Sequence, residues 1–295
     1  MTGGPLLWAL IALMIFGWSG NYVAGKIALR EFPPLLLTSW RALFAGALIL
    51  PAWWWERRGG GARWTWRDAP ALLGLGLLGV TLNQMLFVFG LSRTSVAHAA
   101  IFANLTPIAV LVLASAGGLE RFTAGKLGGM AVALSGVALL KTLEPHAPNA
   151  PRASLAGDLL IFAGGFAFAL FTVFGKPATR RHSSITVNTV AYVAGAMVMA
   201  PVAAWQSARF PMASISLGAW AAVLFMALFS SVISYLIYYW ALARMAPSHI
   251  SAFSYFLPPL ATALGVVVLG ERVTWALAVS AAVIFAGVFL TERAR

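Results

Sequence analysis

The sequence predicts an all-α integral membrane protein with ten transmembrane helices arranged as two inverted five-helix repeats. Three observations lead to this fold class. The 295 residues are 61% hydrophobic and only 9% charged, with a mean hydropathy of +0.86, which is not the composition of a soluble domain. The chain contains successive apolar runs of about 17 to 25 residues, each long enough to span a bilayer. Residues of the first half recur in the second half at a constant displacement.

The predicted helices follow one another with short polar connections. Pro33 and Pro34 precede the second helix and three glycines at 59–61 follow it, while Thr123 and Thr274 are suited to cap the fifth and tenth helices. The first run has neither a basic start nor a small-residue cleavage site, so we expect it to remain as a helix. The ten spans cover about residues 5–25, 34–55, 69–91, 95–117, 123–141, 155–175, 185–205, 217–240, 248–269 and 274–291.

The longest polar connection, PHAPNAPRAS at residues 145–154, separates a first five-helix unit (residues 1–144) from a second (residues 155–295). Residues displaced by 151 repeat as Arg93, His98, Pro107, Glu120, Arg121, Thr123 and Gly136 with Arg244, His249, Pro258, Glu271, Arg272, Thr274 and Gly287. Residues displaced by 150 repeat as Gly25, Lys26, Arg30, Pro51 and Trp55 with Gly175, Lys176, Arg180, Pro201 and Trp205. Because five is odd, the second unit must be inverted, as in alternating-access transporters.

The net charge of +12 is interpreted as a topology signal, with no nucleic-acid partner, because the Lys and Arg residues lie between the apolar runs. With both termini on one side, that side carries 12 of the 20 Lys and Arg residues and the other side seven. We therefore expect both termini in the cytoplasm, an external 145–154 linker and a location in a bacterial inner (plasma) membrane.

Several classes of site are excluded. The chain has no cysteine and its four histidines form no ligand-spaced cluster, so we expect no metal site and no cofactor. All eight carboxylates fall in loops or near helix ends, which argues against coupling to a cation through a buried carboxylate. No phosphate-binding loop and no cluster of catalytic side chains occurs, so we do not expect an enzyme. A channel is an alternative, but a channel gains little from inverted duplication.

Polar and aromatic residues form stripes along six of the predicted helices. In the first helix Trp18, Asn21, Tyr22 and Gly25 occupy one face, and a polar face within a membrane must contact protein or water. Matching stripes are Phe168, Phe171, Thr172 and Gly175; Gly79, Asn83 and Phe87; Ser230, Ser234 and Tyr238; Ala100, Asn104 and Pro107; and Ser251, Tyr255 and Pro258. We expect all six stripes to face one central cavity.

The predicted cavity suits a small zwitterion with a hydrophobic group, because it combines amides, hydroxyls and aromatic faces. Pro107 and Pro258 are predicted hinges, since proline interrupts helical hydrogen bonding. The predicted substrate-binding residues are Trp18, Asn21, Tyr22, Asn83, Gln84, His98, Asn104, Phe168, Phe171, Thr172, Ser234, Tyr238, Ser251 and Tyr255.

Each of these side chains also has a structural interpretation. Ser, Thr and Asn commonly join transmembrane helices, and His98 and His249 can be buried structural histidines. Arg41, about 10 Å into the second helix, can reach the interface, pair with a loop carboxylate or meet a substrate carboxylate. We assign Trp53, Trp54, Trp55, Trp64 and Trp66 to an interfacial aromatic belt and exclude them from the site.

The sequence resembles a known family. The segments PIAVLVLASAGGLERFTAGKLGGMAVALSGVAL and PPLATALGVVVLGERVTWALAVSAAVIFAGVFL are similar to the paired signature of the EamA type of the drug/metabolite transporter superfamily, and Arg41 in SWRALFAGAL matches its second-helix pattern. The resemblance covers the whole chain, is greatest to the YddG group, and implies an exporter of small hydrophobic or aromatic amino acids that acts by alternating access. Because all carboxylates lie in loops or near helix ends, we expect a facilitator or exchanger that is driven by the substrate gradient. The alternative is an exporter of other small metabolites or of aromatic cations and drugs.

Overall fold

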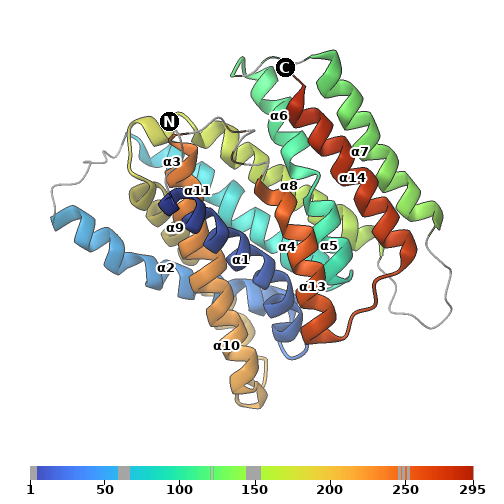
Figure 1. Ribbon diagram of the computed structural model, residues 1–295. Helices are drawn as coiled ribbons and strands as arrows, with labels where there is room; N and C mark the ends of the chain where they lie inside the picture. The colour runs from blue at the N-terminus through green and yellow to red at the C-terminus, as the bar shows by residue number, and fades with distance from the viewer. Residues whose placement is uncertain are drawn as a thin grey trace.

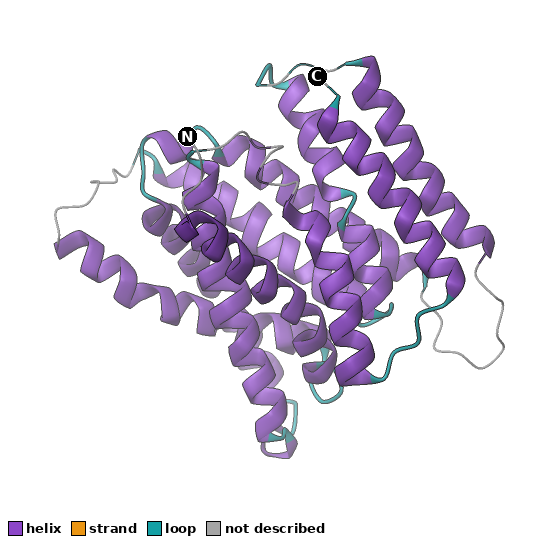
Figure 2. Cartoon of the chain, in the orientation of Figure 1, coloured by secondary structure: helices purple, strands orange, loops and turns teal. Residues whose placement is uncertain are grey.

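The computed structural model describes residues 5–58, 67–119, 121, 123–143, 154–244, 247, 250 and 253–294. Within these residues every regular element is helical and no strand occurs (Figure 2). Seven helical spans are long and apolar enough to cross a membrane, and two further apolar helices, Leu257–Leu269 and Trp275–Thr291, are shorter. The predicted fold class, an all-α integral membrane protein, is therefore confirmed, whereas the count of ten spans stays a prediction.

Most helices follow the predicted boundaries to within a few residues (Figure 1), but the predicted 95–117 span is divided into two helices and α13, in the predicted 248–269 span, begins only at Leu257. The first half contains α1 (Pro5–Ala28), α2 (Pro34–Arg58), α3 (Ala69–Gly76), η1 (Leu77–Leu82), α4 (Asn83–Leu91), α5 (Val96–Ala103), α6 (Thr106–Ala116) and α7 (Ala124–Leu143). The second half contains α8 (Leu155–Gly175), α9 (Ser184–Ser207), α10 (Leu217–Phe225), η4 (Met226–Ile233), α11 (Ser234–Leu242), η5 (Phe253–Phe256), α13 (Leu257–Leu269) and α14 (Trp275–Arg293). Outside the described residues lie Trp64, Trp66, Glu120, residues 145–153 of the predicted linker, His249 and Ser251.

Hydroxyl side chains cap the starts of several helices. Thr274 accepts a hydrogen bond from the N–H of Leu277 at 3.1 Å, and Thr123 accepts one from the N–H of Lys126 at 3.4 Å. These bonds satisfy N–H groups that have no partner within the helix. The two predicted N-caps are therefore confirmed. The same role is played by Ser95, Ser154, Ser183 and Ser216.

Two spans contain π-helical segments, and the spans that follow them are interrupted. η1 leads into α4 and η4 leads into α11, at equivalent places in the two halves. After each, the next span breaks: α5 ends at Ala103 before α6, and the 3₁₀ turn η5 precedes α13. Pro107 and Pro258 both lie in the first turn of the new helical segment, where a missing N–H costs no hydrogen bond. The predicted hinge prolines thus directly follow breaks in the helices.

Helices that contain residues related by the constant sequence displacement pack against each other. α7 lies along α14, as Figure 1 shows, and α2 lies along α9. In the first pair Gly136 faces Ile284 whereas Gly125 faces Ala294, so residue numbers rise along α7 as they fall along α14. The second pair is also antiparallel, because the Trp40 indole N–H donates to Ser207 Oγ at 3.2 Å and Gly46 faces Ala196.

Two polar contacts link short loops to the starts of distant helices. The Ser216 hydroxyl, at the start of α10, donates to Glu31 at 2.6 Å, and this bond lowers the pKa of the Glu31 carboxyl. His182 Nε2 lies 3.6 Å from Asp68 Oδ2, at the start of α3. Each contact thus joins a loop of one half to the residue that precedes a helix of the other half, Ser216 before α10 and Asp68 before α3.

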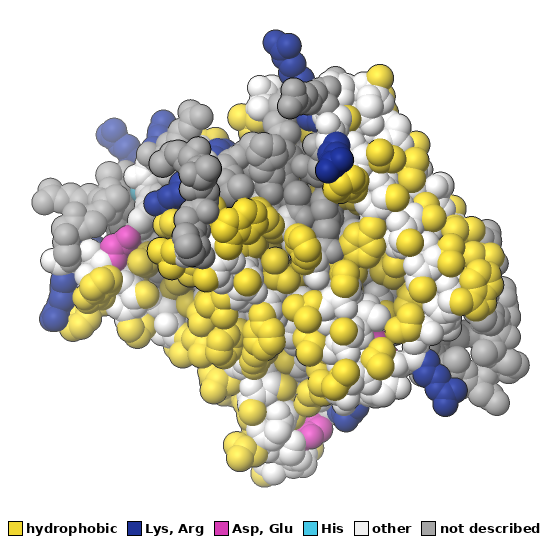
Figure 3. Space-filling model, viewed as in Figure 1, with side chains coloured by type: hydrophobic (Ala, Val, Ile, Leu, Met, Phe, Trp, Pro, Cys, Tyr) yellow, Lys and Arg dark blue, Asp and Glu magenta, His cyan; other side chains and the backbone are white. Residues whose placement is uncertain are grey.

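The molecular surface is suited to lipid. Hydrophobic side chains make a broad band across the face in Figure 3, with Lys and Arg toward its edges. Large apolar side chains are exposed on the molecular surface, including Trp8, Phe16, Leu217 and Val267. Water would not stabilise so much exposed apolar area, whereas acyl chains do.

Candidate functional site

A cavity of about 110 Å³ lies between helices of both halves. A single water needs roughly 10–15 Å³ by the same measure, so this cavity has room for a small organic ligand. Its lining consists of Trp18, Asn21, Tyr22, Arg41, Asn83, Gln84, Phe87, Ala103, Thr106, Ile161, Gly164, Gly165, Phe168, Tyr235, Tyr238, Ser254 and Leu257.

The lining residues are related by the sequence repeat. Gln84 and Phe87 are displaced by 151 from Tyr235 and Tyr238, and Trp18 is displaced by 150 from Phe168. Ala103 and Thr106 are likewise displaced by 151 from Ser254 and Leu257. Positions related by these sequence displacements therefore meet in one cavity.

An aromatic cluster forms one wall of the cavity. The ring centroids of Trp18 and Phe168 are 5.8 Å apart, those of Trp18 and Tyr238 5.4 Å apart, and those of Phe168 and Tyr238 5.0 Å apart. The indole N–H of Trp18 donates to the Ser230 carbonyl at 3.1 Å, which holds the ring in place. Such a wall can contact a flat apolar group or a cation.

Amide side chains connect the elements around the cavity. The Asn83 Nδ2 group donates to the Gly164 carbonyl at 2.8 Å and thereby links α4 to α8. The Tyr235 hydroxyl lies 3.1 Å from Asn83 Oδ1 and 3.2 Å from the Gly79 carbonyl. Hydrogen bonds therefore tie Asn83 to α8 and to α11.

Arg41 brings a positive charge to the cavity. It extends from α2 and is only 3% exposed. Its Nε donates to Ser231 Oγ at 3.0 Å, and the Gln84 Nε2 group donates to the same oxygen at 3.4 Å and to the Tyr192 hydroxyl at 3.2 Å.

The structure brings together seven of the predicted site residues in the cavity lining: Trp18, Asn21, Tyr22, Asn83, Gln84, Phe168 and Tyr238. Ser251 and the Tyr255 side chain lie outside the described part of the chain. The others, His98, Asn104, Phe171, Thr172 and Ser234, do not line the cavity.

Three of these residues have structural contacts instead. The Ser234 hydroxyl lies at hydrogen-bond distance from two carbonyl oxygens, that of Met14 at 3.2 Å and that of Phe229 at 2.8 Å. The contact with Met14 joins α11 to α1. Thr172 Oγ1 lies 2.8 Å from the Tyr238 hydroxyl, which positions that ring at the cavity. Phe171 is fully buried with its ring 4.8 Å from that of Tyr239. Their polar or aromatic character therefore serves helix packing.

Asn104 lies at the break between α5 and α6. It is 2% exposed, and neither its Nδ2 nor its Oδ1 has a hydrogen-bond partner in the described structure. It is next to the lining residue Ala103 but is not itself one of the lining residues.

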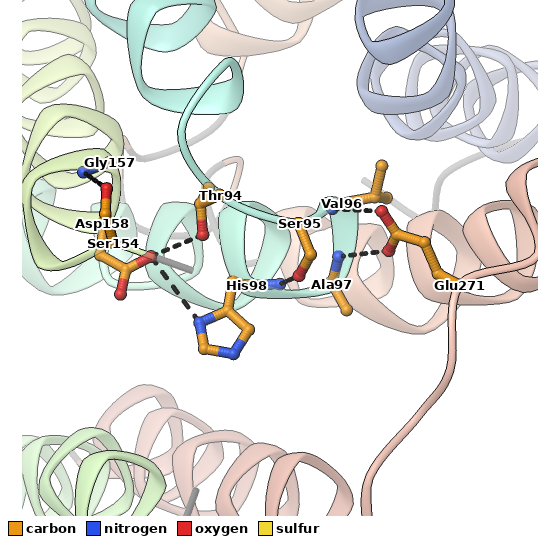
Figure 4. A network of polar contacts seen from close by, with 9 residues as sticks. All are labelled: Thr94, Ser95, Val96, Ala97, His98, Ser154, Gly157, Asp158 and Glu271. Carbon is orange, nitrogen blue, oxygen red and sulfur yellow. Dashed lines mark hydrogen bonds and ion pairs between the residues drawn. The ribbon is translucent and has the colours of Figure 1, made fainter. Parts of the chain in front are cut away.

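His98 belongs to a separate polar network at the start of α5 (Figure 4). Its Nδ1 lies 3.7 Å from Asp158 Oδ1, and the Thr94 hydroxyl donates to the same oxygen at 2.9 Å. On the other side of the helix start, Glu271 accepts hydrogen bonds from the N–H groups of Val96 at 3.0 Å and Ala97 at 3.4 Å. A carboxylate at a helix N-terminus is stabilised by the helix dipole. This network fastens α5 to α8 and to the segment before α14.

Sequence reasoning missed several lining residues. One face of α8 continues the predicted stripe toward the start of the helix, where Ile161, Gly164 and Gly165 precede Phe168 at helical spacing. The sequence identified this face but not how far the cavity extends along it. Tyr235 lies one turn before Tyr238 in α11, and Arg41 was considered without being assigned to the site. Phe87, which was placed on a cavity-facing stripe but not in the substrate-binding set, does line the cavity, and Ala103, Thr106, Ser254 and Leu257 complete the lining.

Comparisons with known proteins agree with this architecture. The EamA-like transporter family model matches residues 5–142 and again residues 155–293. An uncharacterized transporter of Archaeoglobus fulgidus is 27% identical over 297 residues, covering 98% of this chain and 99% of the relative. A protein of Streptantibioticus cattleyicolor named "Probable terminal-alkyne amino-acid exporter" is 26% identical over 287 residues, covering 97% of this chain and 93% of the relative.

A solved crystal structure has the same fold. It is 21% identical, covers 98% of this chain and 96% of its own, and superposes with a TM-score of 0.70. The family model covers nearly the whole chain, and the relatives are transporters rather than enzymes. The chain thus belongs to the EamA-like transporter family and is an integral membrane transporter of small molecules.

Proposed function

We propose that this protein exports small hydrophobic or aromatic amino acids, as the YddG group of its superfamily does, by alternating access. The observation that carries the proposal is the central cavity, where Trp18, Phe168 and Tyr238 form an aromatic wall beside the amides of Asn21, Asn83 and Gln84. An aromatic wall contacts an apolar side chain, and amides bind its polar backbone groups. The amino-acid exporter among the relatives supports the same substrate class.

We further propose that two inverted five-helix units, residues 1–144 and 155–295, alternate around the cavity. Three observations support this duplication. The family model matches each half separately, equivalent helices pack antiparallel as α7 with α14 and α2 with α9, and the cavity is lined by equivalent positions of both halves. Antiparallel packing of equivalent helices is the arrangement that an in-plane two-fold axis produces.

Charge placement bears on both membrane topology and energetic coupling. The excess of Lys and Arg supports cytoplasmic termini in a bacterial inner membrane. None of the described cavity-lining residues is Asp or Glu, so we infer a facilitator or exchanger that follows the substrate gradient. The two conformations differ in their affinity for the substrate, and this difference shifts the equilibrium between them when substrate binds.

The test is uptake by liposomes that contain only the purified protein, with a panel of labelled amino acids, aromatic amines and other small metabolites. The proposal expects uptake of phenylalanine, tryptophan or leucine above protein-free liposomes. Uptake of aromatic cations without any amino acid would favour the second candidate, an exporter of aromatic cations, which the aromatic wall also suits through cation–π contacts. Uptake of neither class refutes both.

A further inference from the structure

Arg41 is a buried cation that has no anionic partner in the part of the chain that the structure describes. It lies about 10 Å along α2 from Pro34, is 3% exposed, and among the described residues makes one hydrogen bond, from Nε to Ser231 Oγ. Its Nη1 has no hydrogen-bond partner, and within the described residues Arg41 forms no salt bridge. The guanidinium therefore has unused hydrogen-bond donors beside the cavity that it lines.

A charge in this position is costly to keep. Burial of an unpaired guanidinium within a membrane is unfavourable, and charges that persist there face a cavity and serve function. The sequence repeat does not account for it either, because the position 150 residues later is Ala191. No described lining residue is Asp or Glu, so the cavity carries a net positive charge. An anionic group of a ligand would compensate this charge.

A second unsatisfied atom lies in the same lining. Asn21 is 7% exposed, and its Oδ1 is buried without a hydrogen-bond partner in the described structure. This oxygen is an acceptor, whereas Arg41 offers donors only. One ligand that carries a carboxylate and an ammonium group would satisfy both.

We propose that Arg41 binds the carboxylate of the transported molecule, so that the cavity selects carboxylates over amines that have the same aromatic ring. The planar guanidinium forms two parallel bonds with a carboxylate, the Asn21 oxygen accepts from the ammonium group, and the aromatic wall contacts the side chain. This inference rests on the proposed function in one respect: it takes this cavity to be the transport site.

The experiment compares three probes with the same ring, L-phenylalanine, 3-phenylpropanoate and phenethylamine. Binding to the purified protein is measured by calorimetry, and uptake of labelled phenylalanine is measured in liposomes. The variants are Arg41→Gln, which removes the positive charge, and Arg41→Lys, which keeps the charge but lacks the planar guanidinium group. Arg57→Gln is the matched control, because Arg57 is an exposed residue at the end of the same helix.

The wild-type protein should bind the two carboxylates at least tenfold more tightly than phenethylamine. Arg41→Gln should weaken both carboxylates by about 10- to 100-fold, the range for a hydrogen bond to a charged group, and leave phenethylamine unchanged or tighter. Arg41→Lys should lie between, and Arg57→Gln should match the wild type. If Arg41→Gln does not fold, the probe ranking of the wild type and the Arg41→Lys result still decide the question.

The outcomes separate this inference from the proposed function. Equal wild-type affinity for phenethylamine and phenylalanine overturns the inference, as does unchanged carboxylate binding in Arg41→Gln, even if phenylalanine is transported. Arg41-dependent binding of 3-phenylpropanoate without phenylalanine uptake supports the inference and refutes amino-acid export. If no probe binds, the inference is wrong.

Discussion

The packing of α7 against α14 allows a quantitative prediction from two glycines of one helix. A Cβ added at Gly136 would lie 2.8 Å from the Ile284 backbone nitrogen and 3.0 Å from the Ser280 carbonyl oxygen, whereas a Cβ at Gly128 would meet no atom within 4 Å. Ordinary contact begins at 3.4 Å, so Gly136→Ala must move the two backbones apart by about 0.6 Å. Overpacking of this kind typically costs about 1–3 kcal/mol.

Gly128→Ala is the matched control. Both substitutions replace a helical glycine by alanine, so the gain in helix propensity of up to about 1 kcal/mol is common to both and cancels. The remaining difference of about 1–3 kcal/mol corresponds to a melting temperature lower by about 2–12 °C in Gly136→Ala than in Gly128→Ala. The assay is thermal unfolding of both purified variants in the same detergent at one heating rate. Equal melting temperatures would falsify the close antiparallel packing of these helices.

Three further outcomes are expected. Trp18→Ala should cut amino-acid uptake in liposomes at least tenfold while Trp53→Ala reduces mainly yield, and the reverse result would place the site elsewhere. Single cysteines at Ala150 and Ala294, in this cysteine-free chain, should react with an impermeant maleimide from opposite sides of the membrane; labelling from one side contradicts the inverted repeat. Labelled amino acid should exchange across liposomes without a proton or sodium gradient, and transport that requires a pH gradient and vanishes in His98→Gln would replace the facilitator with a proton-coupled mechanism.

Helical periodicity was enough to identify the correct face of the first helix. Trp18, Asn21 and Tyr22 follow the 3.6-residue period, and all three line the cavity. The composition and the spans likewise predicted the all-α membrane fold, because the hydrocarbon thickness and the need to satisfy backbone hydrogen bonds leave few alternatives. These features depend on local spacing, which the sequence contains directly.

The extent of the cavity along each helix could not be obtained in that way. On α8 the predicted face is correct, but Phe171 and Thr172 lie against Tyr239 and Tyr238, and the cavity ends at Phe168. A stripe specifies a direction around the helix axis, and says nothing about where along the axis a neighbouring helix covers it.

The sequence by itself therefore determined the membrane class, the helix spans, the repeated positions and the polar faces of the helices. Only the tertiary structure decided which polar residues line a cavity and which join helices. Ser234 bonds to the backbone of α1 and His98 lies beside Asp158, while Arg41 lines the cavity with no Asp or Glu among the described lining residues. The physical reason is that a buried polar group needs a partner, and its partner is supplied by residues distant in the chain, whose approach no local spacing specifies.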